Sequence, residues 1–335
     1  MHTVRPVPDA SGDAFRTDTY ELQVAAVTLE ADETISLILR DTTGADLPSW
    51  APGAHVDLIL PSGMTRRYSL CGSTNDRKHY RIAVLREPNG RGGSVELHNL
   101  PLVGRTLKVR GPRNHFELKD GGSYLFIAGG IGITPILSMI VDLPPAANWT
   151  LYYGGRSRRT MAFIDEVTAI GAGRVRLVPE DEQGLLDLDA ILSSATADSA
   201  IYCCGPAGLL QAVESRKDVL APDAQLYVER FTAVALLRDE AERTVDDVEF
   251  TVELRRSQRI LTVPADRTVL SVIRGVLPDV AYSCEEGYCG TCETRVIEGV
   301  PDHRDDLLSE DERAANRTMM TCVSRARSDR LVLDL

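Results

Sequence analysis

Short apolar runs separated by glycine and proline turns fill the first third of the chain. Strand-length runs rich in aliphatic and aromatic residues stand at 35–40, 54–60, 66–70, 80–87 and 105–112. Turn sequences such as APG and PSG flank them, and no long helical pattern interrupts them. Many short strands with turns of this kind predict an antiparallel β-barrel.

The pattern changes near residue 121. Strand-like runs (YLFIAGG, WTLYYGG, RVRLVPE and SAIYCC) alternate with helix-like runs (ITPILSMIVDL, MAFIDEVTAI, LDLDAILSS and AGLLQAVESRKDVL). Alternation of strands and helices predicts a parallel sheet covered by helices, the α/β class. After a charged stretch, a hairpin pattern over VEFTVELRRSQRILTVPA and a helical pattern over TVLSVIRGVL begin a third unit.

These changes in pattern predict a multidomain protein. We expect a loose N-terminal arm at 1–17, a β-barrel at 18–118, an α/β domain at 119–231, a linker at 232–247 and a cysteine-bearing domain at 248–335. A chain of 335 residues is long enough for two or three domains.

Composition narrows the possible functions. Lys and Arg number 37 against 49 Asp and Glu, a net charge of −12, which argues against nucleic-acid binding. No apolar run approaches the roughly 20 residues that span a bilayer, and the N-terminus lacks the apolar core of a signal peptide. We therefore expect a cytoplasmic protein with no membrane attachment, and a monomer.

Four of the seven cysteines form one pattern near the C-terminus. Cys284, Cys289 and Cys292 have x4 and x2 spacings, and Cys322 follows far downstream. This is the plant-type spacing of a 2Fe–2S cluster, whose irons take four thiolate ligands. The alternative, a structural zinc site, fits poorly, because zinc sites pair a C-x2-C with a second such pair or with histidines.

Two glycine-rich turns follow predicted strands of the α/β unit. Gly129, Gly130 and Gly132 lie between a buried strand and a helix, and YCCGPAGLL repeats the arrangement. Backbone amides at such turns bind pyrophosphate, and ligands of open α/β sheets gather at the carboxyl ends of strands. A tight strand–helix turn without a ligand is the alternative for each cluster taken alone.

A second phosphate site is suggested in the barrel. Arg66 could bind a phosphate bidentately, and Gly92, Gly93 and the Ser94 hydroxyl could surround it. An exposed arginine and a plain hairpin turn are the alternative.

Taken together, RRYSL, GRGGS, GGIGITP, CCGP and the C-terminal cysteine pattern make the chain resemble the phthalate dioxygenase reductase family, which includes vanillate demethylase reductase-like proteins. The similarity extends from about residue 18 to the end. It implies an FMN-binding barrel, a nicotinamide-binding domain and an α+β ferredoxin domain of the β-grasp type.

The resemblance also implies roles for individual residues. Those matching flavin contacts are Arg66, Arg67, Tyr68, Ser69, Ala83, Val84, Leu85, Arg91, Gly92, Gly93, Ser94, Thr134 and Phe231. Those expected beside the nicotinamide are Gly130, Gly132, Cys204, Gly205 and Pro206. Glu229, two residues before Phe231, could orient the nicotinamide carboxamide, and a surface carboxylate is the alternative. The family implies NADH, although Arg156, Arg158 and Arg159 follow a strand where an arginine could hold the 2′-phosphate of NADPH.

The implied function is an NADH-dependent electron-transfer reductase. Hydride would pass from NADH to FMN, and single electrons would leave through the 2Fe–2S cluster to a Rieske non-haem iron oxygenase or a cytochrome P450. No acid–base residue is required, so no catalytic dyad is expected. A reductase for a non-oxygenase acceptor and a non-catalytic iron–sulfur redox sensor are the alternatives.

Overall fold

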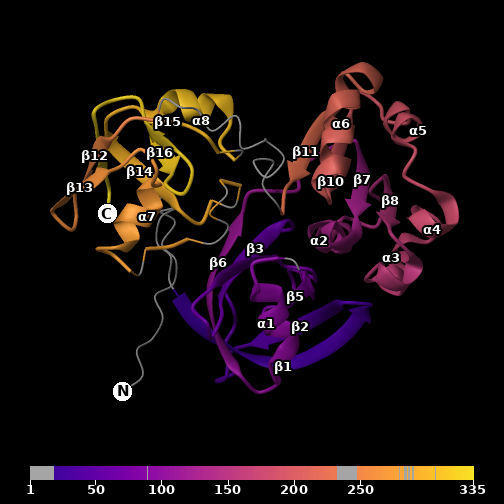
Figure 1. Cartoon of the computed structure of the whole chain (residues 1–335). Coiled ribbons are helices and arrows are strands. Elements are labelled where there is room, and N and C mark those ends of the chain that lie inside the picture. The colour runs from indigo at the N-terminus through magenta and orange to yellow at the C-terminus, as the bar shows by residue number, and fades with distance from the viewer. Residues whose placement is uncertain are drawn as a thin grey trace.

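The structure is a computed structural model of the whole chain (Figure 1). It describes residues 19–88, 90–231, 247–278, 280–282, 285, 287–288, 290–305 and 307–335. The predicted arm, the predicted linker up to residue 246, and two of the predicted ligands, Cys284 and Cys289, lie outside the described residues.

The first part is a closed antiparallel barrel. Its strands are β1 (Thr19–Ala31), β2 (Thr34–Arg40), β3 (Ala54–Ile59), β4 (Thr65–Ser69), β5 (His79–Leu85) and β6 (Thr106–Asn114). They pair antiparallel in the order β4-β3-β6-β1-β2-β5, and a bridge between Leu70 and Ile82 joins the two ends. Closure removes the free sheet edges, and aliphatic side chains fill the interior. The barrel prediction is confirmed.

One short helix in this part was not predicted. GSVELHN forms α1 (Gly93–Asn99), and the preceding Gly92 has a φ of 84°. The left-handed conformation favours glycine and turns the chain directly into the helix. The GRGGS segment is therefore a helix entry and not a hairpin turn.

The second part is a parallel sheet covered by helices. Its strands are β7 (Ser123–Gly129), β8 (Trp149–Gly155), β9 (Val175–Pro179), β10 (Ser199–Cys204) and β11 (Gln225–Glu229), in the order β11-β10-β7-β8-β9. The connecting segments contain η1 (Gly130–Gly132), α2 (Ile133–Asp142), η2 (Arg158–Thr160), α3 (Ile164–Gly171), α4 (Glu180–Gln183), α5 (Leu188–Ser193) and α6 (Ala207–Leu220). All residues of β10 are buried, as expected for a strand covered on both faces. The α/β prediction is confirmed.

The third part is a mixed sheet against one helix. The strands β12 (Phe250–Leu254), β13 (Arg259–Val263), β14 (Glu293–Glu298), β16 (Thr318–Met320) and β18 (Arg330–Leu333) take the order β13-β12-β18-β14-β16. The helix α7 (Val269–Arg274) packs its apolar side chains onto this sheet. A small pair, β15 (Pro301–Asp302) with β17 (Arg325–Ala326), and the helix α8 (Glu310–Ala315) complete it. The predicted hairpin is β12–β13.

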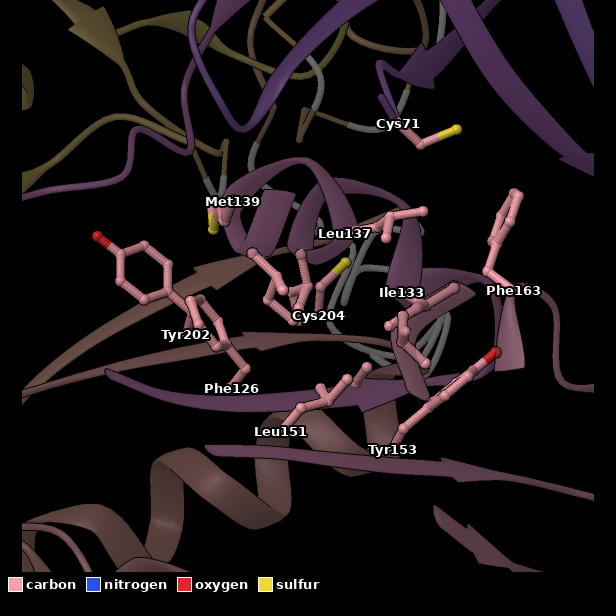
Figure 2. Close-up of a cluster of buried hydrophobic side chains, with 14 of the residues drawn as sticks. Cys71, Phe126, Ile133, Leu137, Met139, Leu151, Tyr153, Phe163, Tyr202 and Cys204 are labelled. Carbon is pink, nitrogen blue, oxygen red and sulfur yellow. The ribbon is translucent and has the colours of Figure 1, made fainter. Parts of the chain in front are cut away.

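The barrel and the parallel sheet share an apolar core. Cys71, Ala83 and Phe116 from the barrel side belong to the same buried cluster as residues of α2 and of the sheet. Figure 2 shows Cys71 on the barrel side of α2, with Phe126 and Leu151 on the sheet. This shared core fixes the position of the nucleotide-domain sheet relative to the barrel.

Among the described helices, none combines the length and the apolar character that crossing a bilayer requires.

Candidate redox site

The structure brings the two predicted flavin phosphate segments together. Arg66 on β4 donates from Nη2 to the Arg91 carbonyl oxygen at 2.9 Å and from Nη1 to the Thr65 carbonyl oxygen at 2.8 Å. A Cβ at Gly93 would lie 2.5 Å from Arg66 Nε, so only glycine lets the arginine lie over this turn. Burial and the nearby Arg91 lower the pKa of Arg66. Two neighbouring guanidinium groups fit a doubly charged phosphate.

The other predicted flavin contacts lie on β4 and β5. Burial raises the pKa of Tyr68, and Ser69 is buried at the end of β4. Side chains alternate along β5, so Ala83 lies in the core shared with the parallel sheet, whereas Val84 points into the barrel interior. Val84 can therefore meet a flavin only through its backbone, and its carbonyl oxygen already lies 3.0 Å from His98 Nε2.

The two predicted glycine turns pack against each other at the carboxyl ends of β7 and β10. A Cβ at Gly132 would lie 2.2 Å from the Cys204 carbonyl oxygen, and one at Gly129 would lie 2.8 Å from Pro206 Cδ. Gly130 has a φ of 54° and open space around its Cβ position. The two turns thus bring their backbones close together at the carboxyl ends of two neighbouring strands, which is where open α/β sheets bind dinucleotides.

Thr134 directly follows the first glycine turn, at the start of α2, whereas Phe231 lies against the apolar core. The Thr134 side chain is buried, and its hydroxyl donates to the Ile131 carbonyl oxygen at 3.0 Å, within the turn. That hydroxyl therefore has only acceptor capacity left for a ligand. Phe231 is partly buried and packs against the core shared by the barrel and the sheet.

Glu229 is half-buried between the sheet and the barrel, and its Oε2 atom is fully buried. It ends β11 opposite Cys204, and its Oε2 has no hydrogen-bond partner among the described residues. Burial raises the pKa of Glu229 to about 8, while the Arg67 charge and the Ser69 hydroxyl, which lies beside it without reaching hydrogen-bond geometry, act in the opposite direction. Burial, and secondarily Glu229, raise the pKa of Cys204. An unpartnered buried carboxyl group fits a carboxamide, which can both donate and accept.

Two of the three arginines after β8 pair with carboxylates. Arg158 Nε lies 3.0 Å from Glu182 Oε1, and Arg159 Nε lies 2.9 Å from Asp32 Oδ2. Arg156 is exposed, and its carbonyl oxygen accepts from the Asp181 amide. A carboxylate beside Arg158 disfavours a second negative group at the same place.

The described residues of the cysteine loop include three with left-handed backbone conformations. Glu285, Gly287 and Gly290 have φ values of 57°, 80° and 72°. A Cβ at Gly287 would lie 2.7 Å from Val323 Cγ2, and one at Gly290 would lie 2.8 Å from Leu307 Cδ2. Both positions therefore require glycine for conformational and for steric reasons.

Two of the four predicted ligands lie side by side. Cys292 and Cys322 are buried in one apolar cluster with Leu270, Leu308 and Met320. The pairing of β14 with β16 brings them together, since the Thr321 hydroxyl donates to the Cys292 carbonyl oxygen at 3.1 Å. The other two cysteines lie outside the described residues, which contain no group of three or more metal-ligating side chains. Two buried thiols brought together from distant parts of the chain fit two of the four ligands of an iron–sulfur cluster.

The remaining cysteines are structural. Cys71 and Cys203 are fully buried, and burial raises the pKa of each thiol to about 12. This agrees with the expectation that they are small apolar residues of strands.

The cysteine loop touches the barrel through residues that the motifs did not identify. The Thr291 hydroxyl donates to Asp57 Oδ2 at 3.2 Å, and a Cβ at Gly290 would lie 3.3 Å from His115 Nε2. His115 stacks on the buried His55 with ring centroids 5.5 Å apart, and burial lowers the pKa of His115 to about 4. One sequence signal was present, because His55 and Asp57 are polar residues two apart within an apolar strand pattern.

Comparisons with known proteins place the chain in a family. Residues 252–327 match the family model of the 2Fe-2S iron-sulfur cluster binding domain. The phenoxybenzoate dioxygenase subunit beta of Ectopseudomonas oleovorans is 43% identical, over 94% of this chain and 97% of that protein.

Solved structures show the same arrangement. The crystal structure of an intact type IV self-sufficient cytochrome P450 monooxygenase matches with a TM-score of 0.84 and 40% identity, over 95% of this chain and 41% of that one. Phthalate dioxygenase reductase, described as a modular structure for electron transfer from pyridine nucleotides to 2Fe-2S, matches with a TM-score of 0.68 and 35% identity, over 95% and 98%. The chain therefore belongs to the phthalate dioxygenase reductase-like family of flavin-dependent, iron–sulfur oxidoreductases.

Proposed function

We propose that this chain is the NADH-dependent reductase component of an oxygenase system. The observation that carries the proposal is the arrangement of the three candidate sites around one barrel. We call the two glycine turns at the carboxyl ends of β7 and β10 the glycine edge. This edge meets the barrel where Glu229 lies beside Ser69, and the cysteine loop meets the barrel where Thr291 bonds Asp57. Such an arrangement suits one electron path from a dinucleotide to a protein acceptor.

The barrel residues would hold FMN. Arg66, Arg91 and the Gly93 turn provide the positive charge and the close backbone approach that a phosphate requires. Ala83 and Leu85, on the outer face of β5, would lie along the ring system. When bound, FMN accepts a hydride and releases electrons singly, and the 2Fe–2S cluster accepts one electron at a time.

The glycine edge would hold the nicotinamide. Gly130, whose Cβ position has open space, would leave room for a ring, and Glu229 would orient the carboxamide of that ring by a hydrogen bond. Because the Oε2 atom of Glu229 and the Cys204 side chain are buried, these residues would also exclude water from the face where hydride is transferred. Tight positioning of this kind is the main contribution a protein makes to hydride transfer between cofactors.

The preference for NADH over NADPH would come from Glu182. Its carboxylate pairs with Arg158 at 3.0 Å, so the arginine that follows β8 is already neutralised. The additional phosphate of NADPH would have to displace this carboxylate, at an unfavourable electrostatic energy. Arg156 would then be a solvated surface residue with no role in binding the dinucleotide.

The acceptor would be a separate oxygenase protein. The relative from Ectopseudomonas oleovorans carries the name of a dioxygenase subunit, and the chain covers nearly its whole length. In the matched P450 structure a similar reductase is joined to the oxygenase in one longer chain. We propose that the domain ranges are those expected from the sequence. We also propose a cytoplasmic location, because the buried cysteines Cys71 and Cys203 are free thiols and thiols stay reduced in that compartment.

The test supplies purified candidate oxygenases of the Rieske and P450 classes to the purified holoprotein. The proposal predicts that NADH consumption is coupled to the oxygenase product with at least one of them, and that NADPH is about tenfold or more less effective. Preference for NADPH would contradict the role of Glu182. Reduction of quinones alone, with no oxygenase supported, would favour a reductase for a non-oxygenase acceptor.

A further inference from the structure

We propose that Asp57 is a positioning residue that holds the cysteine loop on the barrel by accepting a hydrogen bond from Thr291. It would thereby fix the separation between the flavin and the cluster. This inference rests on the proposed function, since it concerns the electron step between the two cofactors.

Asp57 is a buried charge in the wall of the barrel. Its side chain is 2% exposed, and it lies on β3 directly opposite Arg67 of β4. Arg113 Nη1 on β6 lies 3.3 Å from Asp57 Oδ2, and Arg67 Nε lies 3.7 Å from Asp57 Oδ1. Burying a carboxylate is unfavourable unless charges and hydrogen bonds compensate it, so its position is tightly constrained.

The compensating hydroxyl comes from the cysteine loop. Thr291 is 4% exposed and immediately precedes Cys292. Its Oγ1 lies 3.2 Å from Asp57 Oδ2 and 3.4 Å from Oδ1, across 234 positions of sequence. A hydroxyl adjacent to a predicted cluster ligand is therefore bonded to the barrel that would carry the flavin.

A second contact beside it restricts the loop further. Gly290 has a φ of 72°, and its Cβ position lies 3.3 Å from His115 Nε2. His115 stacks on His55, which is buried on the same strand as Asp57. A side chain at position 290 would therefore press on the His115 ring, which restricts how the loop lies beside β3.

The charges on the barrel side have a separate consequence. Arg67, Arg113 and Asp57 place two positive charges and one negative charge on the barrel side of this contact. A 2Fe–2S cluster with four thiolate ligands is anionic and becomes more so on reduction. Asp57 thus both anchors the loop and moderates the positive field near the cluster, and two substitutions separate these effects.

The test uses holoprotein variants in anaerobic stopped flow with NADH. Thr291→Val removes the hydroxyl and keeps the shape, Thr291→Ser restores the hydroxyl, and Asp57→Asn keeps an oxygen acceptor but removes the charge. Thr251→Val is the matched control, since Thr251 lies on β12, whose partners β13 and β18 belong to the same C-terminal sheet. Flavin bleaching and cluster reduction are followed separately, together with iron content.

We expect flavin bleaching at the wild-type rate in Thr291→Val, Thr291→Ser and Thr251→Val. Cluster reduction should slow about tenfold in Thr291→Val, the factor for losing one hydrogen bond to a charged group. Thr291→Ser should recover the wild-type rate, and Thr251→Val should not change it. The reduction potential of the cluster should stay unchanged in Thr291→Val and should rise in Asp57→Asn. Amide exchange of β3 and β6 should accelerate in Thr291→Val.

Cluster reduction at the wild-type rate in iron-replete Thr291→Val would overturn the inference, as would a Thr291→Ser variant as slow as Thr291→Val. If Thr291→Val loses its iron, Asp57→Asn decides the question. If Asp57→Asn keeps its iron, slower cluster reduction and a raised cluster potential support the role of Asp57. An unchanged rate of cluster reduction and an unchanged cluster potential in this variant reject it. Absence of flavin bleaching in the wild type would instead contradict the proposed function.

Discussion

Glu229 combines burial with an unpartnered carboxyl oxygen at the end of a parallel strand. Its pKa of about 8 means that it is largely neutral at pH 7. A neutral carboxyl group can donate a hydrogen bond as well as accept one, which widens its ability to orient a carboxamide. The same raised pKa makes stability depend on pH.

The sign of that dependence follows from linkage. The folded-state pKa of about 8 lies above the ordinary value of 4.5, so the contribution of Glu229 is present below pH 4.5 and is lost as pH rises toward 8. Glu229→Gln cannot ionise and should lack this loss, which amounts to at most about 1.4 kcal/mol per pH unit. The measurement is the thermal midpoint of both proteins from pH 5 to 9. The variant should gain on the wild type as pH rises, and a constant difference would rule out the raised pKa.

Gly93 is a residue for which the structure predicts a specific loss. An added Cβ would lie 2.5 Å from Arg66 Nε and would displace the guanidinium from the turn. We expect Gly93→Ala to weaken FMN binding by about tenfold or more, since a charge-assisted contact to phosphate is lost. Fluorescence titration of the apoprotein with FMN measures this.

Gly208 provides the control for that substitution. It lies in α6, and its Cβ position has open space, so Gly208→Ala should leave FMN affinity unchanged. Equal affinities for Gly93→Ala and the wild type would show that Arg66 is not held over a phosphate site.

Between elements, β5 and α3 are joined by an ion pair that links the barrel to the parallel sheet. Arg81 binds Glu166 bidentately at 2.8 and 2.9 Å, and its guanidinium lies 5.1 Å from the Phe163 ring centroid. Bidentate geometry and partial burial distinguish this pair from ordinary surface ion pairs. Nearby, the Thr74 hydroxyl donates to Asp142 at the end of α2.

Glu166→Gln should therefore both destabilise the protein and disturb hydride transfer. We expect a loss on the order of 1–2 kcal/mol in urea unfolding and a slower bleaching of flavin by NADH, because the nucleotide edge is less firmly held. Asp189→Asn, which breaks the exposed pair of Asp189 with Arg216, should cost about 0.5 kcal/mol or less. Equal effects of the two substitutions would argue against a positioning role for the β5–α3 pair.

Periodicity predicted the elements well where a strand or helix is long and flanked by turns. The run at 207–220 forms α6 over the same residues, and two of the four cysteines singled out by their spacing, Cys292 and Cys322, lie in one cluster. Local pattern could not predict α1, because GRGGS is equally typical of a hairpin turn. It also could not predict that Thr291 meets Asp57, since that contact depends on how two separately folded units pack.

For the molecule as a whole, the barrel is the central part. The parallel sheet lies on one side of it and the C-terminal sheet on another (Figure 1). The first is held by the shared apolar core and the Arg81–Glu166 pair, and the cysteine loop is held by the hydrogen bond from Thr291 to Asp57. An electron path through the chain requires all three parts. Removing the cluster should therefore abolish electron delivery to a protein acceptor and leave hydride transfer to the flavin intact.

The most direct test of the flavin-to-cluster path is Cys292→Ser in the holoprotein. Flavin bleaching under anaerobic NADH and reduction of cytochrome c, a one-electron protein acceptor, are measured in the same preparation. We predict bleaching at nearly the wild-type rate and loss of at least about 99% of the cytochrome c reduction, because hydride transfer does not need the cluster and single-electron delivery does. Cytochrome c reduction at the wild-type rate in a variant shown to lack iron and acid-labile sulfide would contradict the account.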